Sequence, residues 1–363
     1  MKRREFLKAG ALATAASGTI ASPAVAQSLP SVKWRLVSAF PKSLDTLYGG
    51  AEYLSKIVAE ATDKQFQIQP FAAGEIVPGG GAAIDATSNG TVECCHTCSY
   101  YGIGKDPTFA FGTCIPFGLN SRQAFAWHEF GGNDMLNEFY ESYNLYSLPA
   151  GNTGVQMGGW FRKELNTPAD FNGIKFRVGG LAGTILQKLG VVPQMIGGGD
   201  LYAALERGTI DAAEWTGPYD DEKLGLYRVA RNYYYPGWWD QGTVIALMIN
   251  RSKWEELPKH YQAILRRASA ETYAWMQAKY DYQNPPALRR LAAAGAVLRP
   301  FSPEIMEACQ KAAEETYREI AEKNPTFKKF LDSMMSFRDE AYLYWQVSEL
   351  SYDLSIVRAR RSR

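Results

Sequence analysis

Arg177 is the residue whose type and position point most directly to ligand chemistry. It lies near the end of residues 174–178, where apolar side chains alternate with Lys175 and Arg177. This period of two predicts a strand whose two basic side chains share one face. Arg177 is then near the carboxyl end of the strand, where open α/β sheets bind ligands. Its guanidinium offers two parallel donors to a carboxylate, and residues 179–180 are expected to open a helix whose free N–H groups favour an anion.

A second group of polar residues follows other predicted strands. Glu214 and Trp215 end a predicted strand at 210–215, and Gly217-Pro218 turns the chain directly afterwards. A carboxylate in that place can pair with a base, bind a cation or face solvent. The other members are uncharged and lie near further strand ends: Tyr100, Tyr101, Asn152, Gln156 and Gln241. One arginine and one glutamate among neutral groups are typical of binding rather than catalysis.

Three of the five cysteines, Cys94, Cys95 and Cys98, stand close together beside His96. Thiolate and imidazole ligands would suit zinc or copper(I). However, no second Cys-x-x-Cys or His-x-x-x-His completes a set of four ligands. The favoured interpretation is a strand at 91–95 whose cysteines act as small buried apolar residues. An odd, clustered count also argues against a disulfide framework.

The first 26 residues have the features of an export signal. A basic start leads through a mildly apolar stretch to Ala24-Val25-Ala26, a small-x-small cleavage site. The Arg-Arg-x-Phe-Leu-Lys run at 3–8 resembles the twin-arginine motif. A retained membrane anchor is the alternative, but polar residues and a proline interrupt the stretch, and a spanning helix needs about twenty apolar residues. We therefore expect a cleaved signal peptide at 1–26 and a periplasmic protein.

The charge of the remaining chain excludes nucleic acid as an expected partner. The net charge falls from +1 to about −2, because four basic residues and one acid lie in the removed segment. No basic block remains to form an electrostatic footprint for nucleic acid. The chain also exceeds the ~300 residues at which single cores stop growing, so two lobes are expected.

The predicted elements alternate between strands and helices, which indicates an α/β fold with a parallel sheet. Strands are expected at 32–36, 66–68, 154–160, 174–178 and 210–215, with helices between them, and the fully apolar run 242–249 is expected to return to the first lobe. Helical periodicity then extends from 252 to about 293, along both lobes. Pro285-Pro286 is expected to kink or break this helix. The last helix, 327–357, is rich in aromatic residues and packs either on its own lobes or on another subunit.

Two blocks resemble the extracytoplasmic solute-binding proteins of TRAP transporters. Residues 171–177, Phe-Asn-Gly-Ile-Lys-Phe-Arg, are similar to the family's Leu-x-Gly-x-Lys-x-Arg. Residues 201–215 are similar to its Tyr-x-Ala-Leu-x-x-Gly-x-Ile-Asp-Ala-x-Glu run. The agreement extends over nearly all of 31–360. The Glu-Trp-x-Gly-Pro ending and the aromatic last helix look closest to the branch that binds 2-oxo and 2-hydroxy monocarboxylates, such as pyruvate or lactate.

The resemblance implies a two-lobed, periplasmic-binding-protein-like α/β fold with a hinge. Lobe I would comprise 31–150 plus about 240–255, and lobe II 151–239 plus about 295–325. A lobe-spanning helix would occupy about 256–294, and a C-terminal helix at 326–358 would join two chains into a homodimer. The membrane permease of a TRAP transporter would be the second partner, and uptake would be driven by sodium.

The resemblance also implies roles for the polar residues. Arg177 would pair with the substrate carboxylate, and Tyr101, Asn152 and Gln241 would complete the pocket. A cation touching the substrate would be held by Glu214, Trp215 and Gln156, with Gln241 as a further ligand; Trp215 and Gln156 would also contact the substrate. Oxygen ligands of this kind suit sodium or calcium. A single carboxylate among them favours sodium.

Two other functions remain open at this point. One is an exported enzyme for a small carboxylate, with Glu214 as base, although the sequence has no Gly-x-Ser-x-Gly, His-Glu-x-x-His or Gly-x-Gly-x-x-Gly. His128 and His260 lie in predicted helices, where packed or solvated roles are ordinary. The other is a carboxylate-sensing subunit of a signalling protein, which would share the same pocket.

Overall fold

The computed structural model describes residues 29–361, and the signal peptide expected at 1–26 lies outside them. The first lobe is built on a five-stranded sheet in the order β2-β1-β3-β10-β4. β1 pairs in parallel with β2 and β3, whereas β10 is antiparallel to both of its neighbours. The strands are β1 (Val32–Ser38), β2 (Phe66–Phe71), β3 (Cys94–Thr97), β4 (Leu145–Asn152) and β10 (Val244–Asn250).

The second lobe is built on a six-stranded sheet in the order β11-β9-β5-β8-β6-β7. β6 is parallel to β7 and β8, and β5 is antiparallel to β8 and β9. Its strands are short: β5 (Trp160–Phe161), β6 (Lys175–Arg177), β7 (Val192–Gln194), β8 (Ala212–Ala213), β9 (Asn232–Tyr235) and β11 (Val297–Pro300). The expected mixed α/β class with two lobes is therefore confirmed.

Helices pack around the two sheets and on one another. In the first lobe these helices are α2 (Leu47–Ala61), α3 (Gly81–Ser88), α4 (Ser121–Trp127), α5 (Asn133–Glu141) and α9 (Arg251–Glu256). In the second they are α6 (Ala182–Gln187), α7 (Leu201–Glu206), α8 (Pro218–Leu224) and α11 (Pro303–Lys323). Leu47, Leu54 and Val58 of α2 recur at helical spacing and are buried, as their periodicity predicts.

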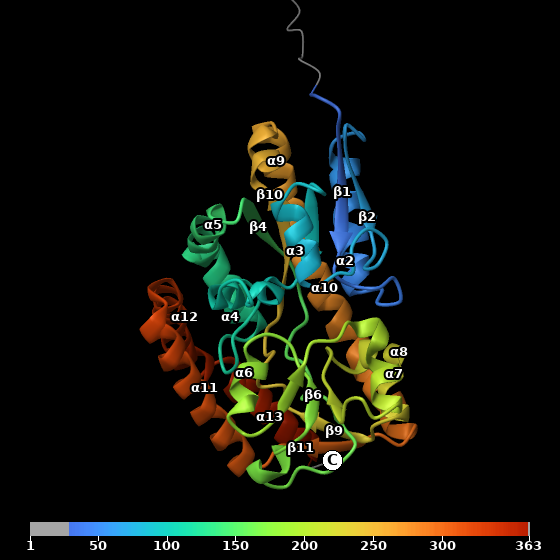
Figure 1. The fold of residues 1–363 in the computed structure, drawn as a ribbon, viewed down its shortest axis with the longest axis vertical. Coiled ribbons are helices and arrows are strands. Elements are labelled where there is room, and N and C mark those ends of the chain that lie inside the picture. Colours follow the sequence, from blue (N-terminus) through green and yellow to red (C-terminus); the bar gives the residue numbers. More distant parts are fainter. Residues whose placement is uncertain (1–28, 362–363) are drawn as a thin grey trace, which may run out of the picture. The chain divides into compact units, whose positions relative to one another are not determined.

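Helix α10 (Lys259–Ala293) runs past both lobes, packing on β4 and α2 in the first and on α8 in the second (Figure 1). The prolines at 285 and 286 lie inside it, and the helix does not end there. Of the kink or break expected at that pair, the break does not occur, because packing along its length holds the helix although two N–H donors are missing. The break lies instead at residues 257–258, between α9 and α10.

Two other predicted elements differ in the structure. Of residues 154–160, only Trp160 belongs to a strand; Gly154 and Gly159 have φ of +72° and +88°, values that interrupt an extended ladder. The segment instead crosses between the lobes. The predicted single C-terminal helix is two helices, α12 (Pro325–Trp345) and α13 (Glu349–Arg361), separated by a turn in which Ser348 Oγ donates to the Tyr344 carbonyl.

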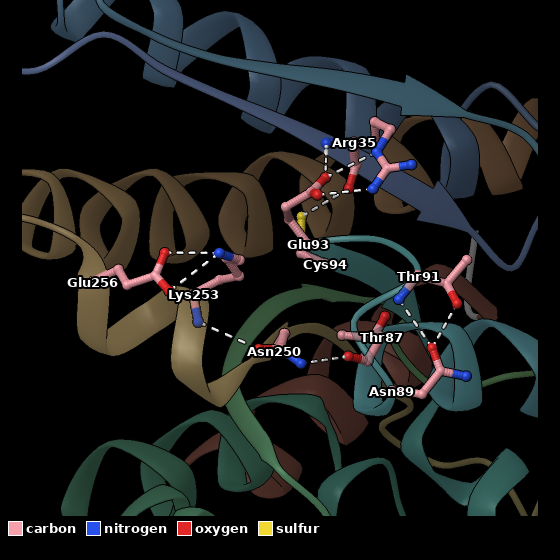
Figure 2. A network of polar contacts seen from close by, with 9 residues as sticks. All are labelled: Arg35, Thr87, Asn89, Thr91, Glu93, Cys94, Asn250, Lys253 and Glu256. Atoms are coloured by element: carbon pink, nitrogen blue, oxygen red, sulfur yellow. Dashed lines mark hydrogen bonds and ion pairs between the residues drawn. The ribbon is translucent and has the colours of Figure 1, made fainter.

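A polar network at one end of the first sheet ties its strands to the neighbouring helices (Figure 2). Arg35 of β1 donates to Glu93, just before β3, through its main-chain N–H and its guanidinium. Asn250, the last residue of β10, donates to the Thr87 carbonyl at 3.0 Å and caps α9 by accepting from the Lys253 N–H. These contacts fix strand ends that lie away from the cavity described next.

Candidate ligand-binding site

A small cavity, partly open to solvent, lies between the two lobes. The first lobe lines it from the segments that follow β1 and β3 and from the start of β10, and the second lobe from β6 and the chain after β8. The lining residues are Phe40, Leu47, Cys98, Tyr100, Tyr101, Thr153, Gln156, Arg177, Trp215, Thr216, Thr243 and Ile245. Strand ends thus converge where α/β sheets bind ligands.

A wider groove adjoins this cavity and shares Tyr101, Arg177 and Trp215 with it. Two glycine runs face the groove, residues 79–81 from the first lobe and 197–199 from the second. A Cβ atom built on Gly197 or Gly199 would meet nothing within 4 Å, so these glycines border open space. The cavity is therefore connected to the exterior through a mouth with few side chains.

Arg177 ends β6 and is 2% exposed, so the sequence placed this guanidinium correctly at a strand end. Its Nε donates to the Ile196 carbonyl at 3.0 Å, and Nη1 donates to the Glu214 carbonyl at 2.8 Å and to Glu214 Oε1 at 2.5 Å. The Trp215 ring lies 4.8 Å from its Cζ, in a cation–π contact. These three hydrogen bonds hold the guanidinium plane while leaving Nη2 outside them.

Glu214 is 1% exposed and is the direct partner of Arg177. Its Oε1 also accepts the Gly179 N–H at 3.0 Å, so the N–H expected to attract a ligand anion binds the protein's own carboxylate. Burial raises the pKa of Glu214 above its ordinary value, and Arg177 offsets only part of this. Burial lowers the pKa of Arg177, but the attraction of Glu214 outweighs it and the net pKa is raised.

Two buried oxygen atoms of these residues have no hydrogen-bond partner among the residues that the structure describes: Gln156 Oε1, whose residue lines the cavity, and Glu214 Oε2, whose residue binds Arg177. Gln156 is fixed through its Nε2, which donates to Thr153 Oγ1 at 3.2 Å and to Thr243 Oγ1 at 3.0 Å. Its Oε1 is therefore held as an acceptor. Unpartnered buried oxygens are costly unless a donor or a cation satisfies them, so this donor set fits a hard cation.

Asn152 and Gln241 do not line the cavity. Asn152 is fully engaged in the crossing between lobes, where Nδ2 donates to the Gly242 carbonyl and Tyr273 Oη and Oδ1 accepts the Gly154 N–H. Gln241 Nε2 donates to the Ile115 carbonyl at 2.8 Å, while its Oε1 is buried without a partner among the described residues. Of the seven expected site residues, five thus meet at the cavity, Glu214 through its bonds to Arg177.

Sequence reasoning missed Asp240, a carboxylate that is 2% exposed and close to this set. It accepts from Thr243 Oγ1 at 3.0 Å and from Cys114 Sγ at 2.8 Å, and its carbonyl accepts the Gln156 N–H. Burial raises the pKa of Asp240, whereas hydrogen bonds and Arg177 lower it. The available signal was an acid that follows Trp238-Trp239 and precedes the mostly apolar run at 242–249.

The three clustered cysteines are buried among apolar side chains, and Cys98 also lines the cavity. Cys94, Cys95 and Cys98 are free and buried, and burial raises the pKa of the Cys95 thiol to about 12. Residues 29–361 contain no group of three or more His, Cys, Asp or Glu side chains that could hold a metal ion, which argues against the soft-metal alternative. His128 is buried, with its pKa lowered to about 4 by burial, and His260 is exposed.

None of the helices within the described residues is long and apolar enough to cross a membrane. The model of the bacterial extracellular solute-binding protein family 7 matches residues 37–324, a span that contains the Arg177 and Glu214 segments. The monocarboxylate 2-oxoacid-binding periplasmic protein of Nostoc sp. strain PCC 7120 is 47% identical over 359 residues, covering 97% of this chain and 98% of that protein.

Solved structures agree with this match. A TRAP transporter solute-binding protein from Bordetella bronchiseptica, a mixed-occupancy dimer with a calcium- and picolinate-bound active site versus an apo site, is 47% identical with a TM-score of 0.90. It covers 92% of this chain and 100% of its own. A TRAP periplasmic solute-binding protein from Pseudoalteromonas atlantica with bound sodium and pyruvate is 33% identical, with a TM-score of 0.85 and coverage of 90% and 99%.

The expected class of protein, a periplasmic solute-binding protein and not an enzyme, is thereby confirmed. The two blocks that carried the resemblance, residues 171–177 and 201–215, both lie inside the matched span and supply Arg177 and Glu214 to the cavity. The chain belongs to the bacterial extracellular solute-binding proteins of family 7, the solute-binding subunits of TRAP transporters.

Proposed function

We propose that the protein captures a 2-oxo monocarboxylate such as pyruvate, together with a bridging cation, and delivers it to a TRAP permease for sodium-driven uptake. The observation that carries this proposal is the buried Arg177 guanidinium, which lines the cavity between the lobes and keeps Nη2 outside its three hydrogen bonds. The 2-oxoacid ligand class of the Nostoc relative and the pyruvate of the Pseudoalteromonas protein support the ligand class.

Each polar group at the cavity has a role in this proposal. The substrate carboxylate pairs with Arg177 and the cation, and Tyr101 closes the cavity from the first lobe. Glu214 Oε2, Gln156 Oε1 and the Trp215 carbonyl hold the cation, which balances the negative charge of the ligand. Asn152 acts from behind the cavity wall by fixing the start of the crossing segment that carries Gln156, and Gln241 ties the neighbour of Asp240 to the Ile115 carbonyl.

The count of buried carboxylates bears on which cation is bound. The sequence indicates one carboxylate, Glu214, which favours sodium. Asp240 adds a second, so Arg177 faces two carboxylates of the protein and a third from the ligand. A divalent cation balances that total more fully than a monovalent one, which makes calcium an equal candidate. The Bordetella protein holds calcium and the Pseudoalteromonas protein sodium.

The C-terminal helices carry the proposed homodimer contact. Apolar side chains on them are exposed, among them Leu343 at 67%, Val347 at 68% and Tyr352 at 66%. Such a run is expected to be covered by a second copy of the chain. Sedimentation of wild-type protein and of a Leu343→Asp/Tyr352→Asp variant tests this. A monomer mass for both proteins would contradict the dimer.

Export through the twin-arginine route is tested separately, by replacing Arg3 and Arg4 with lysine and measuring the yield of protein in the periplasm.

The test of the ligand is a tryptophan-fluorescence titration of refolded, ligand-stripped protein. Pyruvate, longer 2-oxo acids, lactate and a dicarboxylate are compared in sodium, calcium and chelator. We expect saturable quenching by monocarboxylates, dependent on one of the cations and without conversion of the ligand. A folded protein that responds to none of them would refute the ligand class, and equal binding in chelator and in either cation would refute the bridging ion.

A further inference from the structure

Asp45 lies outside the cavity, in the segment that leads from β1 of the first lobe into α2. Its side chain is 51% exposed, whereas the neighbouring Leu44 and Thr46 are fully buried, so the position of its backbone is fixed. The same short segment carries Phe40 and ends at Leu47, and both of these line the cavity. Asp45 is therefore attached to the first-lobe wall of the site without being part of it.

Three side chains from outside this segment bind Asp45. Lys223 of α8 forms an ion pair with Oδ1, and Tyr219 Oη of the same helix donates to Oδ2 at 3.1 Å. Lys279 of α10 donates to the Asp45 carbonyl at 2.6 Å and to Oδ2 at 3.1 Å. Partial burial raises the pKa of Asp45, but the hydrogen bonds from the two lysines outweigh it and the net pKa is lowered.

The partners on α8 belong to the second-lobe wall. Trp215 and Thr216 line the cavity, Gly217 turns the chain, and α8 begins at Pro218 with Tyr219 next to it. Lys223 lies over the Tyr219 ring, with Nζ 3.5 Å from its centroid, so the two groups reach Asp45 as one unit. The contact thus joins the two chain segments that flank the cavity on opposite lobes.

We propose that Asp45 is a positioning residue for ligand capture, which links α8 to the first lobe and so sets how long the lobes stay closed on a bound carboxylate. This inference rests on the proposed function. An interaction shifts a conformational equilibrium only if it differs between the two states. The Asp45–Lys223 and Asp45–Tyr219 contacts join different lobes and are lost when the lobes separate. They favour the closed form and oppose release of the ligand.

The chain offers a matched control beside Lys223. Glu222 of α8 pairs with Arg290 of α10 through two hydrogen bonds of 2.8 and 2.6 Å, and within the described part of the chain no hydrogen bond or ion pair joins either partner to Asp45. Both pairs are partly exposed ion pairs on the same helix. Glu222→Gln removes a charge from α8 without removing the link between lobes, whereas Asp45→Asn and Lys223→Met remove the link.

The experiment is stopped-flow release of pyruvate from wild type, Asp45→Asn, Lys223→Met and Glu222→Gln at low and high salt. We expect release to be about three- to tenfold faster in the two link variants at low salt, with association unchanged. High salt should accelerate release from wild type toward the rate of these variants, because it screens exposed pairs. Glu222→Gln should release at the wild-type rate, and Asp45→Glu should recover part of the loss.

The proposal would be overturned if Asp45→Asn and Lys223→Met released pyruvate at the wild-type rate and with the wild-type salt dependence. Ligand capture would remain intact in that case. Equal acceleration in Glu222→Gln would also overturn it, since the effect would then belong to α8 generally. A second readout does not need the ligand. Small-angle scattering of ligand-free protein should give a larger radius of gyration for Asp45→Asn than for wild type. If no carboxylate binds the wild-type protein, the proposed function fails. Equal radii of gyration for wild type and Asp45→Asn would then also contradict the role of Asp45 in holding the lobes together.

Discussion

Two arginine–glutamate pairs in this molecule have the same chemistry and opposite surroundings. Arg35 and Glu93 pair at one end of the first sheet, with side chains 47% and 18% exposed and guanidinium contacts of 3.1 and 2.8 Å (Figure 2). Arg177 and Glu214 pair at 2.5 Å with exposures of 3% and 1%. Water solvates the charges of the first pair. The charges of the second pair are stabilised by protein atoms alone, or by protein atoms together with a ligand and a cation.

This difference in solvation separates a structural pair from a binding site. An exposed pair contributes little, because water solvates each partner nearly as well as the other partner does. A buried pair is strongly coupled, because removal of either charge leaves the other without compensation. Unpartnered oxygens beside the buried pair, Glu214 Oε2 and Gln156 Oε1, indicate a site that is completed from outside the chain. The Arg35–Glu93 pair has no role in ligand binding on this view.

The largest expected effect is on ligand binding. Arg177→Ala should weaken binding of pyruvate by at least ~100-fold, because the ligand carboxylate loses its charged partner in a desolvated cavity. Arg35→Ala should leave the dissociation constant unchanged. Isothermal titration calorimetry on both variants checks this. Comparable losses in the two, or undiminished binding in Arg177→Ala, would remove the distinction between the pairs.

The second expected effect is on stability. Glu214→Ala should lower the free energy of unfolding of the ligand-free protein by about 3 kcal/mol, since the buried guanidinium loses the carboxylate that it contacts directly. Glu93→Ala should lower it by about 1 kcal/mol or less. Urea unfolding of both variants at one pH measures the contrast. A Glu214→Ala protein as stable as wild type would show that water or ions already reach the buried pair.

A buried carboxylate without a guanidinium sharpens the contrast. Asp220 accepts only from Tyr280 Oη among the described residues, at 2.6 Å, and burial raises its pKa to about 7. A raised folded-state pKa means that its contribution to stability is complete below the ordinary value near 4 and is lost as pH rises through 7. Asp220→Asn should therefore gain about 2 kcal/mol relative to wild type between pH 5 and pH 8. Urea midpoints at both pH values measure it, and parallel pH profiles would contradict it.

The smallest expected effect is the coupling within the exposed pair. A double-mutant cycle on Arg35→Ala and Glu93→Ala should give a coupling free energy below about 1 kcal/mol that decreases in high salt. Unfolding in urea at low and high ionic strength measures the four corners of the cycle. A large, salt-insensitive coupling would mean that the Glu93 bonds to the Arg35 main chain and side chain act as one rigid unit.

Alternation and strand-end placement were enough to predict Arg177, because side-chain period and strand polarity are local properties of the chain. The same reasoning placed Glu214 at a strand end but did not predict that its Oε1 would take the Gly179 N–H, thirty-five residues away. Asp240 escaped notice for a similar reason. Its burial depends on Cys114 and Thr243 packing around it, and no local pattern specifies that.

By itself, the sequence determined the class of fold, the strand that carries Arg177 and the burial of the clustered cysteines as small apolar residues. Periodicity and composition are sufficient for these, because they act over a few residues. Tertiary structure alone decided that residues 154–159 cross between the lobes, that α10 continues through two prolines, and that Asp45 binds α8. Each of these depends on contacts between segments far apart in the chain. Such contacts supply free energy that overrides local preference.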